Sequence, residues 1–201
     1  MKTLRPSIVA VLSVLAAPVV AGEMPQDALI AALKSGGHVI YLRHTSTESD
    51  YADQITADPA NCASQRVLSE KGWTQARDIG QAVQRLHIPV DEVISSEYCR
   101  AWQTADLAFG HYSKTAALNF EPAETYTDAQ LARMRNRVSP LINAPLVAGG
   151  GNRVIVGHDD PFEAVTGIYP EPQGVAYLLR PDGAGSFTVL GHIDPDAWPN
   201  S

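Results

Sequence analysis

The stretch HVIYLRH, residues 38–44, is the clearest strand signal in the chain. Its middle part, VIYL, is an uninterrupted run of β-branched, aromatic and aliphatic side chains, and two glycines precede the stretch. Such a run is typical of a buried strand in a parallel sheet. The apolar run stops at Arg43 and His44, so the pattern places two polar side chains at the carboxyl end of the expected strand.

Strand and helix signals alternate along the rest of the chain. Apolar spacing predicts helices over 25–34, 69–86 and 97–109, and a fourth that starts at a capping box of Thr127 with Gln130 and runs to Ile142. Further strands are expected over 90–94, 116–120 and 153–156, and a hairpin over 174–180 and 186–193. This alternation predicts an α/β fold, a three-layer α/β/α sandwich around a mainly parallel sheet.

The composition fits one globular domain. The chain has 201 residues, of which 45% are apolar, which is enough for one domain and too little for two ordinary ones. Its formal net charge of −7 argues against a protein that grips nucleic acid through its overall charge. We therefore expect no nucleic-acid partner.

Residues 1–21 have the layout of a secretory signal peptide. Lys2 and Arg5 precede an uncharged run over 8–20, and the segment ends in the pattern VVA. The run is shorter than the ~20 residues that span a bilayer, so we expect no stable membrane insertion after cleavage. The mature chain, residues 22–201, would be one domain with 13 basic and 22 acidic residues, located in the periplasm or secreted.

Export bears on the two cysteines, Cys62 and Cys99. Outside the cytoplasm a pair of thiols tends to oxidise. A bridge between them would close a loop of 37 residues, which the chain-entropy model values at roughly 3–4 kcal/mol. We predict this disulfide; the alternative is a pair of unrelated buried thiols.

Three expected strand ends bring chemically active side chains to one edge of the sheet. In open α/β sheets the chemistry lies just beyond the carboxyl ends of the strands. Arg43 and His44 follow the first strand, and a helix that carries Arg100 near its start follows the second. His158 and Asp159 follow a later strand. The pattern therefore predicts that two imidazoles and two guanidiniums surround one pocket.

Four segments resemble, in order, the histidine phosphatase (phosphoglycerate mutase-like) superfamily. They are YLRHT at 41–45, RVLSEKG at 66–72, SSEYCRAWQTA at 95–105 and VIVGH at 154–158. The resemblance, which extends across residues 38–160, is to a compact member, because only the segment 45–68 leaves room for an elaboration near the site. Thr45 stands where the family usually has glycine, and since a β-branched residue tolerates a positive φ poorly, the local backbone is expected to differ.

The resemblance implies a role for each residue of the cluster. His44 would be the nucleophile that forms a phosphohistidine, and His158 would stabilise the phosphoryl oxygens in the transition state. Arg43 and Arg100 would bind the phosphate and would also depress the imidazole pKa values. The second ring nitrogen of His44 is expected to donate to a backbone carbonyl, which would fix its tautomer.

The acid that protonates the leaving group stays open. Asp159 resembles the proton donor of the acid-phosphatase branch, whereas Glu124 lies nearer the place of the glutamate in the small-mutase branch. We favour Asp159 over Glu124. The other candidate carboxylates are Asp160, Glu97 and Glu121.

These features predict an exported phosphoric monoester hydrolase of the histidine acid phosphatase type. We expect no cofactor and no metal, because the phosphate pocket requires no ion and the sequence has no HExxH motif. The expected partner is a small phosphorylated substrate or a phosphate ester of the cell envelope. The alternatives are a non-catalytic module that binds a phosphorylated envelope ligand, a phosphomutase, and a zinc hydrolase built on His44, His158 and Asp159.

Overall fold

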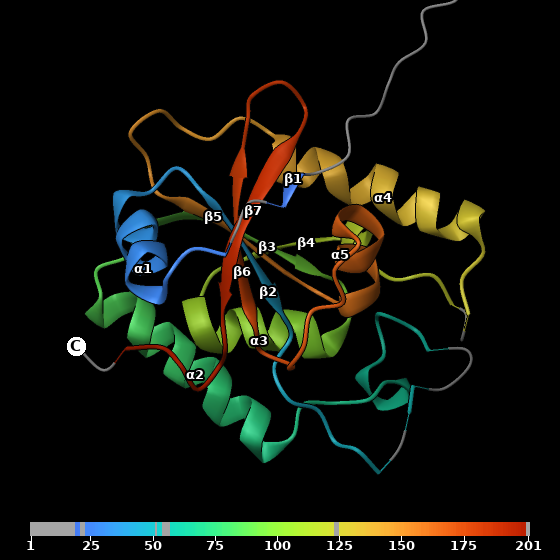
Figure 1. Cartoon of the computed structure of the whole chain (residues 1–201). Helices are drawn as coiled ribbons and strands as arrows, with labels where there is room; N and C mark the ends of the chain where they lie inside the picture. The colour runs from blue at the N-terminus through green and yellow to red at the C-terminus, as the bar shows by residue number, and fades with distance from the viewer. Residues whose placement is uncertain (1–18, 21–22, 51, 54–56, 123–124, 200–201) are drawn as a thin grey trace, which may run out of the picture.

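Figure 1 shows the computed structural model of the chain, which describes residues 19–20, 23–50, 52–53, 57–122 and 125–199. The helices are α1 (Gln26–Ser35), α2 (Glu70–Arg85), α3 (Cys99–Phe109), α4 (Asp128–Asn143) and α5 (Asp159–Thr166), with short 3-10 helices η1 (Cys62–Ser64) and η2 (Ala116–Leu118). The strands are β1 (Val19–Val20), β2 (Val39–Arg43), β3 (Val90–Ser96), β4 (Ser113–Thr115), β5 (Asn152–Gly157), β6 (Ala176–Pro181) and β7 (Phe187–Ile193). Most of the predicted signal peptide lies outside the described residues, as does Glu124.

The strands form one sheet in the order β1-β7-β6-β2-β5-β3-β4. The central strands β2, β5, β3 and β4 pair in parallel, as do β1 and β7 at the other edge. β6 runs antiparallel to both β2 and β7. The sheet is therefore mainly parallel, with the C-terminal hairpin that the sequence predicts.

Helices cover both faces of the sheet, which confirms the predicted three-layer sandwich (Figure 1). α1, α2 and α3 pack on one face, where Leu29, Ile79 and Ala105 contribute to the core. α4 and α5 pack on the other face through Ile142 and Phe162. The two faces of each strand contribute to the two cores, since Val39 and Tyr41 lie in one core and Ile40 and Leu42 in the other.

Local sequence signals explain most element boundaries, with one exception. Ser69 caps α2 by accepting a hydrogen bond from the backbone nitrogen of Gly72, and the capping box at the start of α4 is present. The strand predicted over 116–120 is wrong. The edge strand lies earlier, at Ser113–Thr115, and the Thr115 hydroxyl then caps η2, which turns Leu118 into the core.

None of the helices within the described ranges has the length and apolar character needed to cross a membrane.

Candidate active site

Strand register brings the predicted residues together. Arg43 of β2 lies opposite Gly157 of β5, so the next residues on each strand, His44 and His158, lie side by side at one sheet edge. The backbone nitrogen of His44 donates to the Gly157 carbonyl at 2.9 Å. The centroids of the two imidazole rings are 5.4 Å apart. The expected meeting of strand ends is therefore confirmed.

A glycine at position 157 is required by this arrangement. A Cβ atom there would overlap the hydroxyl oxygen of Tyr41. That hydroxyl donates to the backbone carbonyl of His158 at 2.8 Å within the core. Gly157 thus lets Tyr41 hold the backbone that carries His158.

His44 presents an unprotonated nitrogen to the site. Its side chain is buried, and the Nε of Arg100 lies 3.3 Å from its Nε2. Because a guanidinium can only donate, this Nε2 must be the acceptor, and the proton of the neutral ring lies on Nδ1. Nδ1 in turn donates to the backbone carbonyl of Thr45 at 2.9 Å. The predicted contact to a backbone carbonyl is present, and its partner is the next residue.

Thr45 adopts ordinary backbone geometry. Among the described residues the only non-glycine residue with a positive φ is His87, so no strain arises where the family usually has glycine. The Thr45 side chain is fully buried, and its hydroxyl lies 3.1 Å from that of Thr104 on α3. This pair of hydroxyls joins the end of β2 to the helix that carries Arg100.

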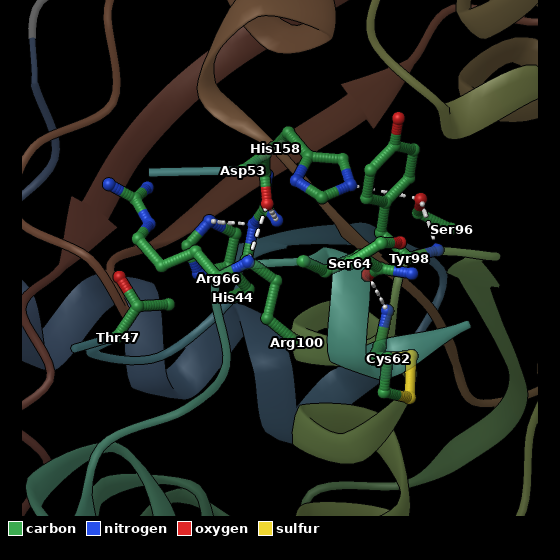
Figure 2. Close-up of polar contacts among 12 residues, drawn as sticks. His44, Thr47, Asp53, Cys62, Ser64, Arg66, Ser96, Tyr98, Arg100 and His158 are labelled. Atoms are coloured by element: carbon green, nitrogen blue, oxygen red, sulfur yellow. Dashed lines mark hydrogen bonds and ion pairs between the residues drawn. A yellow bond between two sulfur atoms is a disulfide. The ribbon is translucent and has the colours of Figure 1, made fainter. Parts of the chain in front are cut away.

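His158 is oriented by a chain of hydrogen bonds that begins at Asn119. The Ser96 hydroxyl donates to Asn119 Oδ1 at 2.7 Å, and the Ser96 oxygen lies 2.9 Å from His158 Nε2. Since the single proton of Ser96 is given to Asn119, its oxygen must accept from His158, so Nε2 carries the proton. The opposite nitrogen, Nδ1, is buried without a hydrogen-bond partner (Figure 2). A neutral His158 therefore offers a free lone pair.

Both histidines are held neutral. Burial, followed by the positive charge of Arg100, holds the pKa of His44 well below its ordinary value. The same two causes, in the same order, hold the pKa of His158 well below its ordinary value. A neutral His44 is what a nucleophilic role requires.

The depressed pKa values predict how stability depends on pH. In the unfolded chain these histidines take up protons below about pH 6.5, whereas in the folded chain they stay neutral. The free energy of unfolding should therefore fall as the pH falls from about 6.5 towards the folded pKa values. Replacing His158 with glutamine, which keeps a partner for Ser96, should make this slope shallower by roughly one proton. Urea titrations between pH 7 and 5 measure the slope.

The matched control is His111→Gln, because His111 is exposed. It should leave the slope as in the wild type. An equal slope in the His158→Gln protein would contradict a neutral, buried His158.

Arg100 is fixed by aromatic rings and an acidic partner. Its guanidinium carbon lies 5.2 Å from the ring centroids of both Tyr98 and Phe120. Its two terminal nitrogens donate to the carboxylate of Asp53 at 2.9 and 3.0 Å. The backbone nitrogen of Arg66 also donates to Asp53, at 2.7 Å. Arg100 is therefore buried in a defined position beside His44.

Arg43 is engaged by a second acidic group. Its terminal nitrogens bind Asp159 Oδ2 at 2.5 Å and the carbonyl oxygen of Pro170 at 2.7 Å, with Glu171 at 3.0 Å. Its Nε is buried without a hydrogen-bond partner, as is the Nε of Arg66. Together with His158 Nδ1, these atoms leave unmet hydrogen-bonding capacity in the part of the molecule where a phosphate is expected.

The acid candidates differ in environment. Burial raises the pKa of Asp159, but the charge of Arg43 and a hydrogen bond from Tyr169 outweigh it, so the net pKa is lowered. Asp160 accepts a hydrogen bond from Tyr126 at 2.9 Å, and burial together with the neighbouring Asp159 raises its pKa.

The other two candidate carboxylates among the described residues interact with other side chains. Glu121 pairs with Arg133 and Arg137, and Glu97 accepts a hydrogen bond from Asn119.

The predicted disulfide is confirmed. Cys62 and Cys99 are bonded, and their Cα atoms are 5.6 Å apart. The bridge ties the segment before Arg66 to the first residue of α3, next to Arg100 (Figure 2). The backbone nitrogen of Cys99 also donates to the Gln65 side chain at 2.8 Å. Two interactions therefore join the segment before Arg66 to the start of α3.

Sequence reasoning missed the partners that hold these residues. Asp53 lies in an irregular polar segment with no motif around it, and Asn119 follows η2. Tyr169 is a lone aromatic in the loop after α5. No local pattern marks any of them, because each is defined by a residue distant in sequence. Over the described ranges, no three His, Cys, Asp or Glu side chains gather as ligands for a metal ion.

Part of the sequence matches a known protein family. The family model described as the histidine phosphatase superfamily (branch 1) matches residues 39–123, which include His44 and Arg100. No curated protein matches the sequence.

Solved structures share the fold. A phosphoserine phosphatase of Entamoeba histolytica has a TM-score of 0.59 at 12% identity, over 81% of this chain and 99% of that chain. The protein histidine phosphatase SixA, complexed with tungstate, has a TM-score of 0.55 at 14% identity, over 79% and 97%. A mycobacterial glucosyl-3-phosphoglycerate phosphatase in complex with VO3 has a TM-score of 0.53 at 16% identity, over 72% and 92%. The family model therefore confirms, over residues 39–123, the resemblance to the histidine phosphatase superfamily predicted from the motifs. The solved structures show the same fold over most of the chain.

Proposed function

We propose that this protein is an exported phosphomonoesterase that hydrolyses a phosphate ester through a phosphohistidine on His44. The observation that carries the proposal is the unprotonated Nε2 of His44, held beside the Arg100 guanidinium at 3.3 Å. A nucleophilic nitrogen next to a fixed cation is what attack on a phosphoryl group requires. Relatives of similar fold that are called phosphatases support the same class of reaction.

In the first step Nε2 of His44 attacks phosphorus, the N–P bond forms and the ester P–O bond breaks. The leaving oxygen takes a proton from Asp159. Arg43 and Arg100 stabilise the phosphoryl oxygens, and so does His158 once the negative charge of the bound phosphate has raised its pKa and Nδ1 has taken up a proton. In the second step water attacks phosphorus and gives its proton to Asp159. The N–P bond then breaks, which releases phosphate and the free imidazole.

Asp159 needs a proton before the first step, although its pKa is low in the ligand-free protein. Burial raises the pKa of Asp159, and the largest cause that lowers it is the charge of Arg43, followed by the hydrogen bond from Tyr169. A bound phosphate dianion shares the Arg43 guanidinium and offsets its charge, so the Asp159 pKa rises when substrate binds. Substrate thereby creates the acid that it needs.

Trapping the intermediate tests the proposal. The protein is incubated with a ³²P-labelled phosphate ester, quenched in alkali, which preserves phosphohistidine, and digested so that the label can be mapped. We expect the label on the peptide that contains His44. Label on another residue would refute the assignment of the nucleophile.

Replacing Asp159 with asparagine should slow the reaction of esters with poor leaving groups far more than that of esters with good leaving groups. A p-nitrophenolate leaves without a proton, so the rate of the first step with p-nitrophenyl phosphate, measured in a single turnover, should change by less than about threefold. An alkyl phosphate needs the proton, and its single-turnover rate should fall about a hundredfold. Asp160→Asn is the matched control and should affect both substrates equally. Equal losses with both substrates in the Asp159→Asn protein would mean that Asp159 only positions Arg43.

Export is supported by the sequence pattern of residues 1–21 and by the disulfide, which forms and persists in oxidising compartments. The proposed location is the periplasm or the medium, and the proposed substrate is a small or envelope phosphate ester.

Three assay results would favour the alternative functions. Failure to release phosphate from p-nitrophenyl phosphate would favour the binding-module alternative. Activity that a chelator abolishes would favour a zinc hydrolase, and transfer of phosphate to a second hydroxyl would favour a mutase.

A further inference from the structure

The carboxylate of Asp53 occupies the place where the proposed site would hold an anion. It accepts hydrogen bonds from both terminal nitrogens of Arg100 and from the backbone nitrogen of Arg66. Figure 2 shows it between His158 and the pair formed by His44 and Arg100. A planar carboxylate on three converging N–H donors is an internal counterpart of a bound oxyanion.

The donors around Asp53 are held by other contacts. The disulfide and the Gln65 hydrogen bond fix the segment before Arg66 to the start of α3. The Arg100 guanidinium also lies against the paired rings of Tyr98 and Phe120, with its carbon 5.2 Å from each centroid. The donors therefore stay in place when the carboxylate leaves, and they remain available to another anion.

A phosphate group cannot use these donors while Asp53 does. Both would need the terminal nitrogens of Arg100, and two anions at this distance repel each other. The Asp53 side chain is 21% exposed, so it can turn towards solvent, whereas the Arg100 side chain, 5% exposed, cannot follow. Binding of a phosphorylated ligand therefore requires the carboxylate to leave.

We propose that Asp53 is an autoinhibitory carboxylate, which competes with the phosphate group for Arg100 and is displaced when a phosphorylated ligand binds. The inference rests on the proposed function only in taking Arg100 as a phosphate ligand. The apparent affinity for phosphate then equals the intrinsic affinity multiplied by the fraction of molecules in which Arg100 is free of Asp53. A ligand without enough negative charge to displace Asp53 is excluded.

Binding of inorganic phosphate, measured by calorimetry at pH 7, tests this competition. Asp53→Asn keeps an acceptor for the Arg66 nitrogen but removes the charge. We expect it to bind phosphate at least about tenfold more tightly than the wild type. Asp53→Ala should shift the affinity in the same direction, which excludes an effect peculiar to asparagine. Asp50→Asn is the matched control, because Asp50 is exposed in the same segment, and it should bind as the wild type does.

Opposite changes in thermal stability and in phosphate affinity distinguish competition from a purely structural role of Asp53. Loss of an ion pair should lower the melting temperature of ligand-free Asp53→Asn protein, while phosphate binding tightens. Unchanged or weaker phosphate binding would overturn the proposal, as would the absence of binding in every variant.

Ester hydrolysis is measured separately from phosphate binding. A fall in kcat for p-nitrophenyl phosphate of more than about tenfold would also overturn the proposal, because Asp53 would then act in the chemistry. If Asp53→Asn binds phosphate more tightly but the wild type hydrolyses no ester, the proposed phosphatase function fails and the competition stands.

Discussion

Replacing His44 with asparagine should lower phosphate-ester hydrolysis at least about a thousandfold, because no other group can form the covalent intermediate at that position. Asparagine is small enough for the buried site, and its amide can still donate to the Thr45 carbonyl. The loss should appear in kcat and in kcat/KM alike. Release of p-nitrophenol and mapping of the phosphorylated residue measure it.

The control for this change is His111→Asn, an exposed histidine outside the site. It should leave kcat unchanged. The His44→Asn protein should keep its circular dichroism spectrum and should still bind inorganic phosphate, because Arg43 and Arg100 are intact. More than about a tenth of wild-type activity in a folded His44→Asn protein would exclude His44 as the nucleophile.

Removing the disulfide should have the largest effect on stability. The bridge closes a loop of 37 residues, so its loss should lower the free energy of unfolding by roughly 3–4 kcal/mol. In a chain of this length that corresponds to a fall in melting temperature of about 10 °C. The variant Cys62→Ser with Cys99→Ala avoids placing a hydroxyl at position 99, which is 1% exposed. Urea unfolding and thermal melts measure the change.

Wild-type protein treated with a reductant is the matched comparison, since it lacks the bridge and keeps both sulfurs. Reduced wild type and the double variant should unfold at the same urea concentration. A change below about 1 kcal/mol would mean that the segment before Arg66 holds its place on α3 without the bridge. The Gln65 hydrogen bond to Cys99 would then carry the attachment.

The amino-acid sequence determined the architecture because the fold depends on local signals. Apolar runs gave the buried strands, and the capping residues Ser69 and Thr127 gave the helix starts. The strand ends gave His44 and His158. These features are encoded within a few residues of one another, so they can be recognised without knowing what lies across the sheet. The motifs around Arg43 and Arg100 then pointed to the superfamily.

Only the tertiary structure decided the protonation state and the occupancy of the site. Ser96 and Asn119 set the tautomer of His158, and Asp53 lies on Arg100. Each of these contacts joins residues that are 23 to 62 positions apart. A hydrogen bond depends on distances of a few tenths of an ångström, and no local pattern in the sequence specifies such a distance between remote segments. The sequence therefore predicted the candidate catalytic groups, and the packing of the chain set their charge and their partners.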